Sequence, residues 1–123
     1  MKFKKPHFIA SPSEEAHEQK RLLTSKYGDF DSNEADAIVV LGGDGFMLQA
    51  IRDFMDRRVP FFGLNYGSIG FLMNSINEED LINRLESSQY VQVSPLIMTA
   101  YDNKGSFHTA KAINEVSLLR QTH

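Results

Sequence analysis

The chain has 123 residues, of which 41% are hydrophobic, and its formal net charge is -3 at pH 7. This length suits one globular domain with a modest core, and the charge gives no electrostatic basis for binding nucleic acid. The chain has no cysteine, which excludes disulfides and thiolate metal sites and fits a reducing compartment. The apolar stretch near the basic amino terminus is too short for a signal peptide or a membrane span. We therefore expect a soluble, cytoplasmic protein that binds neither nucleic acid nor a membrane.

The first predicted strand is the apolar run Phe8–Ala10, and the segment after it predicts a helix. Ser11 is expected to cap this helix, with Pro12 at the first helical position and Glu14 three residues after the serine, an arrangement typical of a capping box. Gly28 stands where the helix should end. The residues expected on the buried face are Ala16, Leu23 and Tyr27.

The run Ala37–Leu41 predicts a second strand, buried on both faces, because it is apolar without interruption and rich in β-branched residues. The glycines at positions 42, 43 and 45 end it sharply. Apolar residues then recur at helical spacing, which predicts a second helix with its charged residues on the opposite side. The apolar positions are Phe46, Met47, Ala50, Ile51, Phe54 and Met55, and the charged ones are Arg52, Asp53 and Asp56.

Residues 59–64 (VPFFGL) predict a third strand, followed by a loop and by a helix over residues 78–88. The apolar face expected on this helix consists of Leu81, Ile82 and Leu85. Strands that alternate with helices are typical of a parallel sheet covered by helices. The fold class expected for residues 1–92 is therefore α/β, a parallel sheet with helices on both faces.

The last third of the chain differs in character, since it has no amphipathic pattern and carries the turn signal DNKG at 102–105 between two extended segments. This pattern predicts a β-hairpin. A hairpin alone is marginal in water, so we expect it to pair with strands outside this chain. Residues 93–123 are accordingly interpreted as the first strands of a truncated, β-rich second domain.

The turn LGGDGF at 41–46 places the carboxylate of Asp44 inside a glycine cluster between a strand and a helix. It matches neither the dinucleotide fingerprint nor the P-loop. The glycines let a backbone approach a ligand closely, and the N–H groups that begin the helix face an anion. Asp44 could accept a proton from a hydroxyl or help to hold Mg²⁺. A plain turn or helix-cap role explains this aspartate equally well from the pattern alone.

Two further segments carry candidate binding residues. The loop after the third strand and the glycine turn should flank one crevice, because ligands of parallel sheets bind beyond the carboxyl ends of the strands. Phe71 in that loop is explained by an aromatic ligand platform or, more simply, by the core. Asn114 and Glu115 interrupt an apolar strand, and the pattern favours an edge strand over a binding role. The four histidines show no metal-ligand spacing, so no metal site is predicted.

Three motifs in order resemble the ATP-NAD kinase family in its bacterial branch: LGGDGFML at 41–48, GLNYGSIGFL at 63–72 and INEVSLLR at 113–120. Each motif is weak alone, but the ordered set is specific and covers essentially the whole chain. The resemblance implies an NAD kinase, which transfers a phosphoryl group from ATP or polyphosphate to the 2′-hydroxyl of the adenosine ribose of NAD, giving NADP. It also implies Mg²⁺ as the divalent cation, with NAD and ATP as the small-molecule ligands.

The resemblance also implies roles for individual residues. Asp44 would be the general base that takes the proton from the ribose hydroxyl, and it would also bind the substrate. Gly45 and Leu48 would approach the nucleotide.

The other two motifs supply the remaining residues of the implied site. Phe71 and Leu72 match the pair that borders the adenine. Asn114 and Glu115 match the pair that hydrogen-bonds the dinucleotide.

Members of the family continue past the last motif into a β-rich domain with a further nucleotide-binding motif. The resemblance therefore implies that this chain is the amino-terminal portion of a kinase, incomplete and less stable on its own. It implies a homo-oligomer, dimer or tetramer, for the intact protein.

Two alternatives stay open. The GGDG turn also resembles lipid and diacylglycerol kinases and, more distantly, phosphofructokinases, although a Thr or Ser usually follows the turn in lipid kinases where this chain has Phe46. The chain could instead be a non-catalytic nucleotide-binding fragment.

Overall fold

The computed structural model describes residues 3–65, 73–75, 81–93 and 116–120. Its elements in chain order are β1 Pro6–Ala10, α1 Glu14–Tyr27, β2 Ala37–Leu41, α2 Asp44–Phe54, the 3₁₀ turn η1 Met55–Arg57, β3 Phe61–Asn65, β4 Asn74–Ser75, α3 Leu81–Ser87, β5 Gln89–Val93 and β6 Val116–Arg120.

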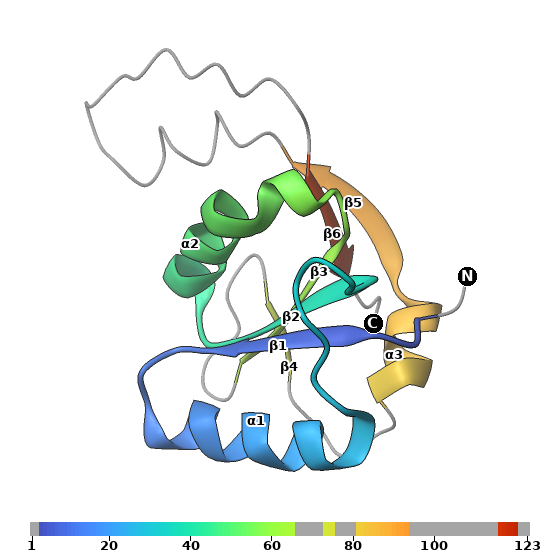
Figure 1. Ribbon diagram of the computed structural model, residues 1–123. Coiled ribbons are helices and arrows are strands. Elements are labelled where there is room, and N and C mark those ends of the chain that lie inside the picture. The colour runs from blue at the N-terminus through green and yellow to red at the C-terminus, as the bar shows by residue number, and fades with distance from the viewer. Residues whose placement is uncertain (1–2, 66–72, 76–80, 94–115, 121–123) are drawn as a thin grey trace, which may run out of the picture.

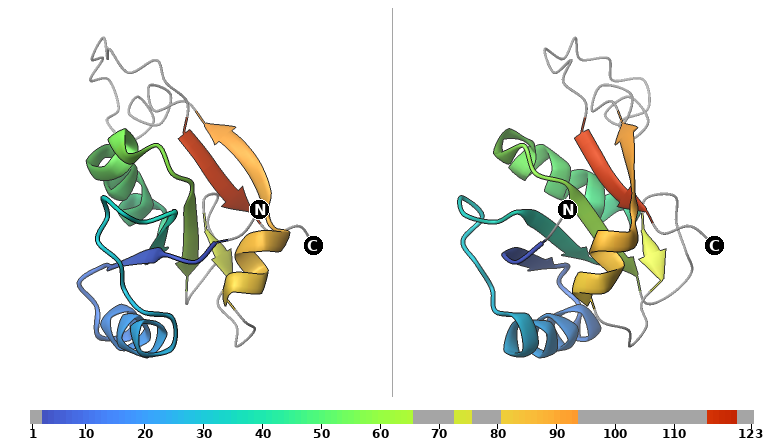
Figure 2. Two further views of the ribbon diagram at one scale, coloured as in Figure 1. Left: turned by 45° about the vertical axis from the view of Figure 1, so that its right-hand side comes forward. Right: turned by 90° about the vertical axis from the view of Figure 1, so that its right-hand side faces the viewer.

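The strands form one sheet in the order β1-β2-β3-β6-β5, and β4 pairs with β3 as well. The pairings of β1 with β2, β2 with β3, and β3 with both β4 and β6 are parallel. Only β5, which pairs with β6, runs antiparallel to its neighbour within the described strands. Helices α1 and α2 lie on opposite sides of this sheet (Figures 1 and 2). The α/β fold class predicted from the sequence is therefore confirmed.

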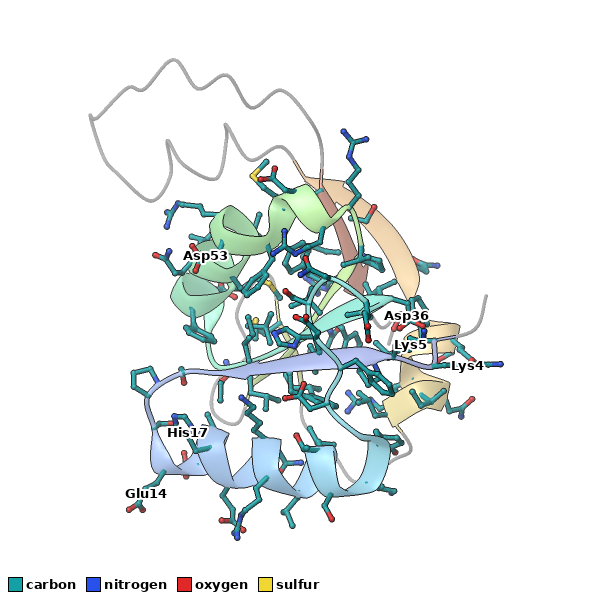
Figure 3. The ribbon with its side chains drawn as sticks, viewed as in Figure 1. Lys4, Lys5, Glu14, His17, Asp36 and Asp53 are labelled. Carbon is teal, nitrogen blue, oxygen red and sulfur yellow. The ribbon has the colours of Figure 1, made fainter. Side chains whose placement is uncertain are left out.

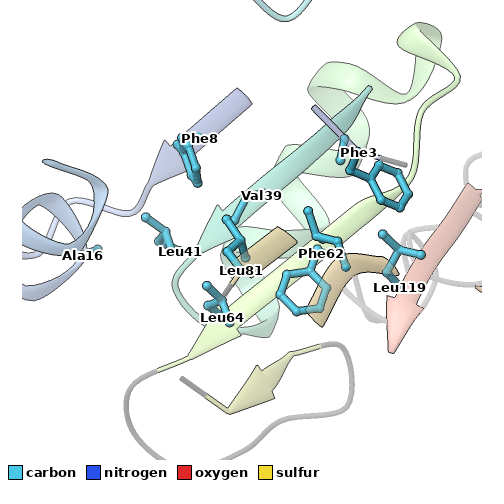
Figure 4. Close-up of a cluster of buried hydrophobic side chains, with 11 residues drawn as sticks. Phe3, Phe8, Ala16, Val39, Leu41, Phe62, Leu64, Leu81 and Leu119 are labelled. Carbon is cyan, nitrogen blue, oxygen red and sulfur yellow. The ribbon is translucent and has the colours of Figure 1, made fainter. Parts of the chain in front are cut away.

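Strand β2 separates two hydrophobic cores, and all five of its residues have zero exposure. Alternate side chains of a strand point to opposite faces, so β2 contributes to both cores. The first core, drawn in Figure 4, holds α1 and α3 and consists of Phe3, Phe8, Ala16, Ala37, Val39, Leu41, Phe62, Leu64, Leu81, Leu85 and Leu119. The second core holds α2 and consists of Ala35, Ile38, Val40, Met47, Ala50, Ile51, Phe61, Met73, Val116 and Leu118.

Helix α1 begins two residues later than the sequence suggested, so the prediction of Ser11 as its cap is wrong. The cap is Ser13, whose backbone is extended and whose hydroxyl accepts a hydrogen bond from Ala16 N at 3.1 Å. Ser11 instead continues β1, because its N–H donates to Leu41 O at 2.9 Å. Gly28 ends the helix with φ of 83°, as predicted, in a conformation that favours glycine.

The free edge of β1 is covered by the segment that follows α1. Phe30 N donates to Pro6 O at 3.1 Å, and Phe8 N donates to the carboxylate of Asp29 at 3.1 Å. Proline itself has no N–H to offer at such an edge. Backbone groups that would otherwise be open to another strand therefore have partners within the chain.

The same segment fixes the approach to β1 through one carboxylate. Asp36 accepts hydrogen bonds from Lys4 N at 2.7 Å and from Lys5 N at 3.0 Å, and the three residues lie together in Figure 3. Because a carboxylate that accepts backbone N–H groups makes charge-assisted hydrogen bonds, this contact joins the start of the chain firmly to the entry of β2.

One edge of β3 is shared by two strands, and the side chain of Asn74 bridges the place where they meet. Strand β6 pairs near the start of β3 and β4 pairs at its end. Asn74 is 6% exposed, and its Nδ2 donates to Gly63 O at 3.0 Å and to Leu119 O at 3.1 Å. This amide therefore connects three strands.

Several boundaries differ slightly from the predictions. Strand β3 begins at Phe61 rather than at residue 59, and α3 is described from Leu81 onward. The predicted turn at 102–105 lies outside the described residues. Strands β5 and β6 do pair antiparallel, within the same sheet as β1 to β3. A division of the chain into domains 1–92 and 93–123 stays a prediction. In the described part of the chain, no helix combines the length and apolar character that crossing a bilayer requires.

The position of the α1 cap gives a direct test. Ser13→Ala should lower the free energy of unfolding by about 1 kcal/mol, because the helix loses the acceptor for an N–H of its first turn. Ser11→Ala should change it by less than about 0.5 kcal/mol, as is usual where no such feature is lost. Urea unfolding of both variants measures the difference, and an equal loss in the two variants would contradict the assignment.

The bridging amide of Asn74 gives a second test. Asn74→Leu should lower the free energy of unfolding by about 2–4 kcal/mol, because two buried carbonyls each lose a donor. The matched control is Asn83→Leu, since Asn83 is exposed on α3. Urea unfolding should show little change in the control, and a similarly small change in Asn74→Leu would mean that the bridge contributes little.

Candidate functional site

The carboxyl ends of β1, β2 and β3 lie side by side and are held in line by hydrogen bonds that continue past the strands. Ser11 N donates to Leu41 O at 2.9 Å, and Gly42 N donates to Leu64 O at 3.0 Å. Asn65 ends β3 at the same edge. In parallel α/β sheets, ligands bind outside this edge.

Helix α2 begins at this edge after a turn of two glycines. Gly43 occupies the cap position with extended backbone angles and no side-chain cap, and its carbonyl accepts a hydrogen bond from Met47 N at 2.9 Å. Asp44 is thus the first helical residue and not the cap. The first N–H groups of a helix have no acceptor within the helix, and they form the positive end of its dipole. The turn therefore presents several donors and one carboxylate at the same point.

The glycines of this turn differ in what the fold requires of them. A Cβ at Gly42 would lie 3.0 Å from Cδ2 of Phe46 and 3.2 Å from Cβ of Ser11, so a side chain there would require these neighbours to shift. At Gly43 and Gly45, apart from the adjoining residues and the backbone of the same helix turn, no atom of the described chain lies within 4 Å of the Cβ position. Neither of these two has a positive φ. Neither the backbone conformation nor the packing of the described residues therefore explains glycine at 43 and 45, whereas close approach of a ligand does.

The structure brings together three of the predicted site residues. Asp44, Gly45 and Leu48 lie on the first turns of α2. Asp44 and Leu48 are both partly buried, and their spacing of four residues places them on the same face of the helix. A carboxylate and an apolar side chain thus lie on the same part of α2 as the open Cβ position of Gly45.

The other four predicted residues, Phe71, Leu72, Asn114 and Glu115, lie outside the described residues. Val116, which follows Glu115, begins β6. Because β6 runs parallel to β3, with Leu118 opposite Phe61, Val116 lies toward the amino ends of the strands. The described start of β6 therefore stands at the edge opposite to Asp44.

One residue at the candidate site was not predicted as part of it. Ser11 was interpreted as a cap, yet it stands directly at the carboxyl end of β1, next to the glycine turn. Asn65, which begins the loop predicted to flank the crevice, ends β3 at the same edge. The signal that could have indicated Ser11 is its position directly at the end of a parallel strand. Elsewhere, Nδ1 of His7 lies 2.7 Å from Phe30 O, and within the described residues no three His, Asp or Glu side chains are grouped to hold a metal ion.

Comparison with known proteins shows the family of this chain. Residues 2–90 match the profile of the ATP-NAD kinase N-terminal domain. An NAD kinase of Caulobacter vibrioides is 44% identical over 94% of this chain and 44% of its own length, and one of Hyphomonas neptunium is 46% identical over 94% and 45%. An NAD kinase of Rhizobium meliloti is 45% identical over 99% of this chain and 48% of its own length. The chain thus spans less than half the length of these curated relatives. By these matches, the chain belongs to the ATP-NAD kinase family and carries its amino-terminal domain.

Proposed function

We propose that the intact protein containing this chain is an NAD kinase, which transfers the terminal phosphoryl group of ATP to the 2′-hydroxyl of the adenosine ribose of NAD and gives NADP. Membership of the family supports this proposal. The observation that carries it is the open space at Gly43 and Gly45, directly beside the carboxylate of Asp44 and the amino end of α2. A phosphate and a hydroxyl could both approach there without displacing a side chain of the described chain.

The reaction requires one proton acceptor at the attacking hydroxyl. The ribose oxygen forms a bond to the terminal phosphorus of ATP, the bond from that phosphorus to the ADP oxygen breaks, and the hydroxyl proton passes to Asp44. The N–H groups at the start of α2 would stabilise negative charge on the phosphates. Alignment and charge stabilisation supply most of the catalysis in phosphoryl transfer, so the fixed position of Asp44 on a helix matters more than its strength as a base.

The turn offers a magnesium ion one carboxylate, that of Asp44, so substrate phosphates and water would have to supply the other ligands. Mg²⁺ usually keeps several waters and is held by one or two carboxylates together with substrate phosphates. Within the described residues there is no cluster of three potential ligands, so Asp44 would be the carboxylate beside an ion held mainly by ATP. When bound, the ion would neutralise charge on the transferring phosphoryl group.

The rest of the binding site is proposed from the motif matches. Leu48 would contact the nucleotide beside Asp44. Phe71 and Leu72 would border the adenine. Asn114 and Glu115 would hydrogen-bond a part of the dinucleotide that extends toward the other edge of the sheet, because the next residue, Val116, begins β6 at the edge opposite to Asp44. We also propose that residues 93–123 begin a second, β-rich domain and that the intact protein is a cytoplasmic homo-oligomer.

The role of Asp44 can be tested in the intact protein. Asp44→Asn keeps the shape of the side chain but removes its ability to take a proton, so kcat for NADP formation from NAD, ATP and Mg²⁺ should fall by about 100-fold or more. Asp53→Asn is the control, because Asp53 is exposed on the same helix and bonds Gln49, and it should retain activity. Full activity in Asp44→Asn would rule out Asp44 as the general base. A wild-type protein that is folded but forms no NADP would rule out the proposed NAD kinase activity.

The two classes of glycine give a second test. Gly45→Ala should leave the free energy of unfolding unchanged or raise it by up to about 1 kcal/mol, since alanine stabilises a helix more than glycine does. It should nevertheless weaken NAD binding, because the methyl group enters the open space. Gly42→Ala should instead lower the stability by about 1–3 kcal/mol through overpacking. Urea unfolding and calorimetric titration with NAD distinguish the two variants. Unchanged NAD affinity in Gly45→Ala would contradict the proposal that the ligand occupies the open space at Gly45.

A further inference from the structure

The middle of β3 lacks a side chain at Gly63, and two buried methionines occupy the space that a side chain would take. A Cβ at Gly63 would lie 2.5 Å from Sδ of Met73 and 2.8 Å from Cε of Met47. Both methionines are almost completely buried, at 1% and 0% exposure. Because protein interiors are close-packed, an added atom here must displace one of these side chains together with what it packs against.

The main chain at Met73 has little freedom to move away, so only the side chain of Met73 can shift. The next residue, Asn74, pairs in register with Leu64 of β3, and its side chain donates to the carbonyls of Gly63 and Leu119. The main chain beside Met73 is therefore fixed to two strands.

Met47 is the other partner, and it belongs to the helix that carries the candidate site. It lies three residues after Asp44, and its N–H donates to Gly43 O at 2.9 Å. The Met47 atom in question is the tip of a flexible side chain, but that side chain has zero exposure, so any displacement that its rotation does not absorb is passed to the first turn of α2, including Asp44 and Gly45.

We propose that Gly63 is a positioning residue for Asp44. Its missing side chain sets how closely α2 lies against β3, and this distance determines where the carboxylate stands relative to a bound hydroxyl. The inference rests on the proposed role of Asp44 as the base. Because reacting groups must be aligned, a displacement of about 1 Å can lower a rate by about 100-fold.

The test is made on the intact protein with a compensating pair of substitutions. Gly63→Ala should lower kcat for NADP formation by about tenfold or more through the same misalignment. Met73→Val removes the Sδ and Cε atoms of Met73 that would meet the new methyl group and leaves space into which Cε of Met47 can shift without moving α2. The double variant has the same number of non-hydrogen side-chain atoms as the wild type. The double variant should therefore recover kcat to within about threefold of the wild type, as volume-conserving swaps are tolerated best.

Ala37→Val is the matched control. Ala37 has zero exposure and belongs to the first core, on the face of the sheet opposite to α2. Ala37→Val should lower the melting temperature because it overpacks the first core, yet it should leave kcat within about threefold of the wild type. A loss of kcat in this control equal to that in Gly63→Ala would reduce Gly63 to a general contributor to stability and overturn the proposal.

A second readout does not depend on activity. Amide hydrogen exchange over residues 44–51 should rise in Gly63→Ala and return toward the wild-type level in the double variant, while exchange over α1 stays unchanged. If the wild type forms no NADP, the proposed function fails, and the exchange pattern still decides whether Gly63 places α2.

Three outcomes would overturn the proposal: unchanged kcat and exchange in Gly63→Ala, loss of kcat that Met73→Val does not restore, or increased exchange spread over both helices. If Gly63→Ala does not fold, Met73→Val alone is compared with the double variant. The proposal then requires lower kcat in Met73→Val, because α2 settles into the vacated space, and recovery when Gly63→Ala is added.

Discussion

The burial of β2 on both faces is the constraint on which the rest of the structure depends. Five consecutive side chains with zero exposure require a covering layer on each side of the sheet. Helices α1 and α3 cover one face, and α2 covers the other. Because α2 must reach its face directly from the end of β2, the connection has room for two residues only, Gly42 and Gly43. The need to cover a strand thus brings the amino end of a helix, with Asp44 in its first turn, to the ligand-binding edge of the sheet.

Packing and chemistry are consequently difficult to separate in this domain. A side chain at Gly42 or Gly63 would press on neighbouring side chains, whereas Gly43 and Gly45 face open space among the described residues. Two glycines therefore hold α2 close to the sheet, and two leave its first turn accessible. The adjacent glycines Gly42 and Gly43 thus have different roles, close packing at the first and access at the second. Only the atoms around each Cβ position distinguish these roles.

Much of this architecture could be predicted from local patterns. The unbroken apolar run of β2, the helical spacing of α2 and the stop at Gly28 each depend on neighbours in the sequence, and the structure confirms them. The cap of α1 was misplaced because a hydrogen bond to Leu41, thirty positions away, recruits Ser11 into the sheet. Strand β4 was missed because two residues show no periodicity, and the partners of Asn74 lie 11 and 45 residues away. At the site, the sequence predicted both the motif around Asp44 and the crevice that it shares with the loop beginning at Asn65. The place of Ser11 beside them depends on its hydrogen bond to Leu41 O.

The covered edge of β1 has a consequence for how the sheet can be enlarged. The segment around Asp29 and Phe30 already bonds the outward groups of Pro6 and Phe8, so an incoming strand finds few free groups on that side. The other end of the described sheet is β5, which pairs through β6 alone. Among the described strands, the β1 side is therefore closed to an incoming strand and resists edge-to-edge association, whereas β5 has a pairing partner on one side only.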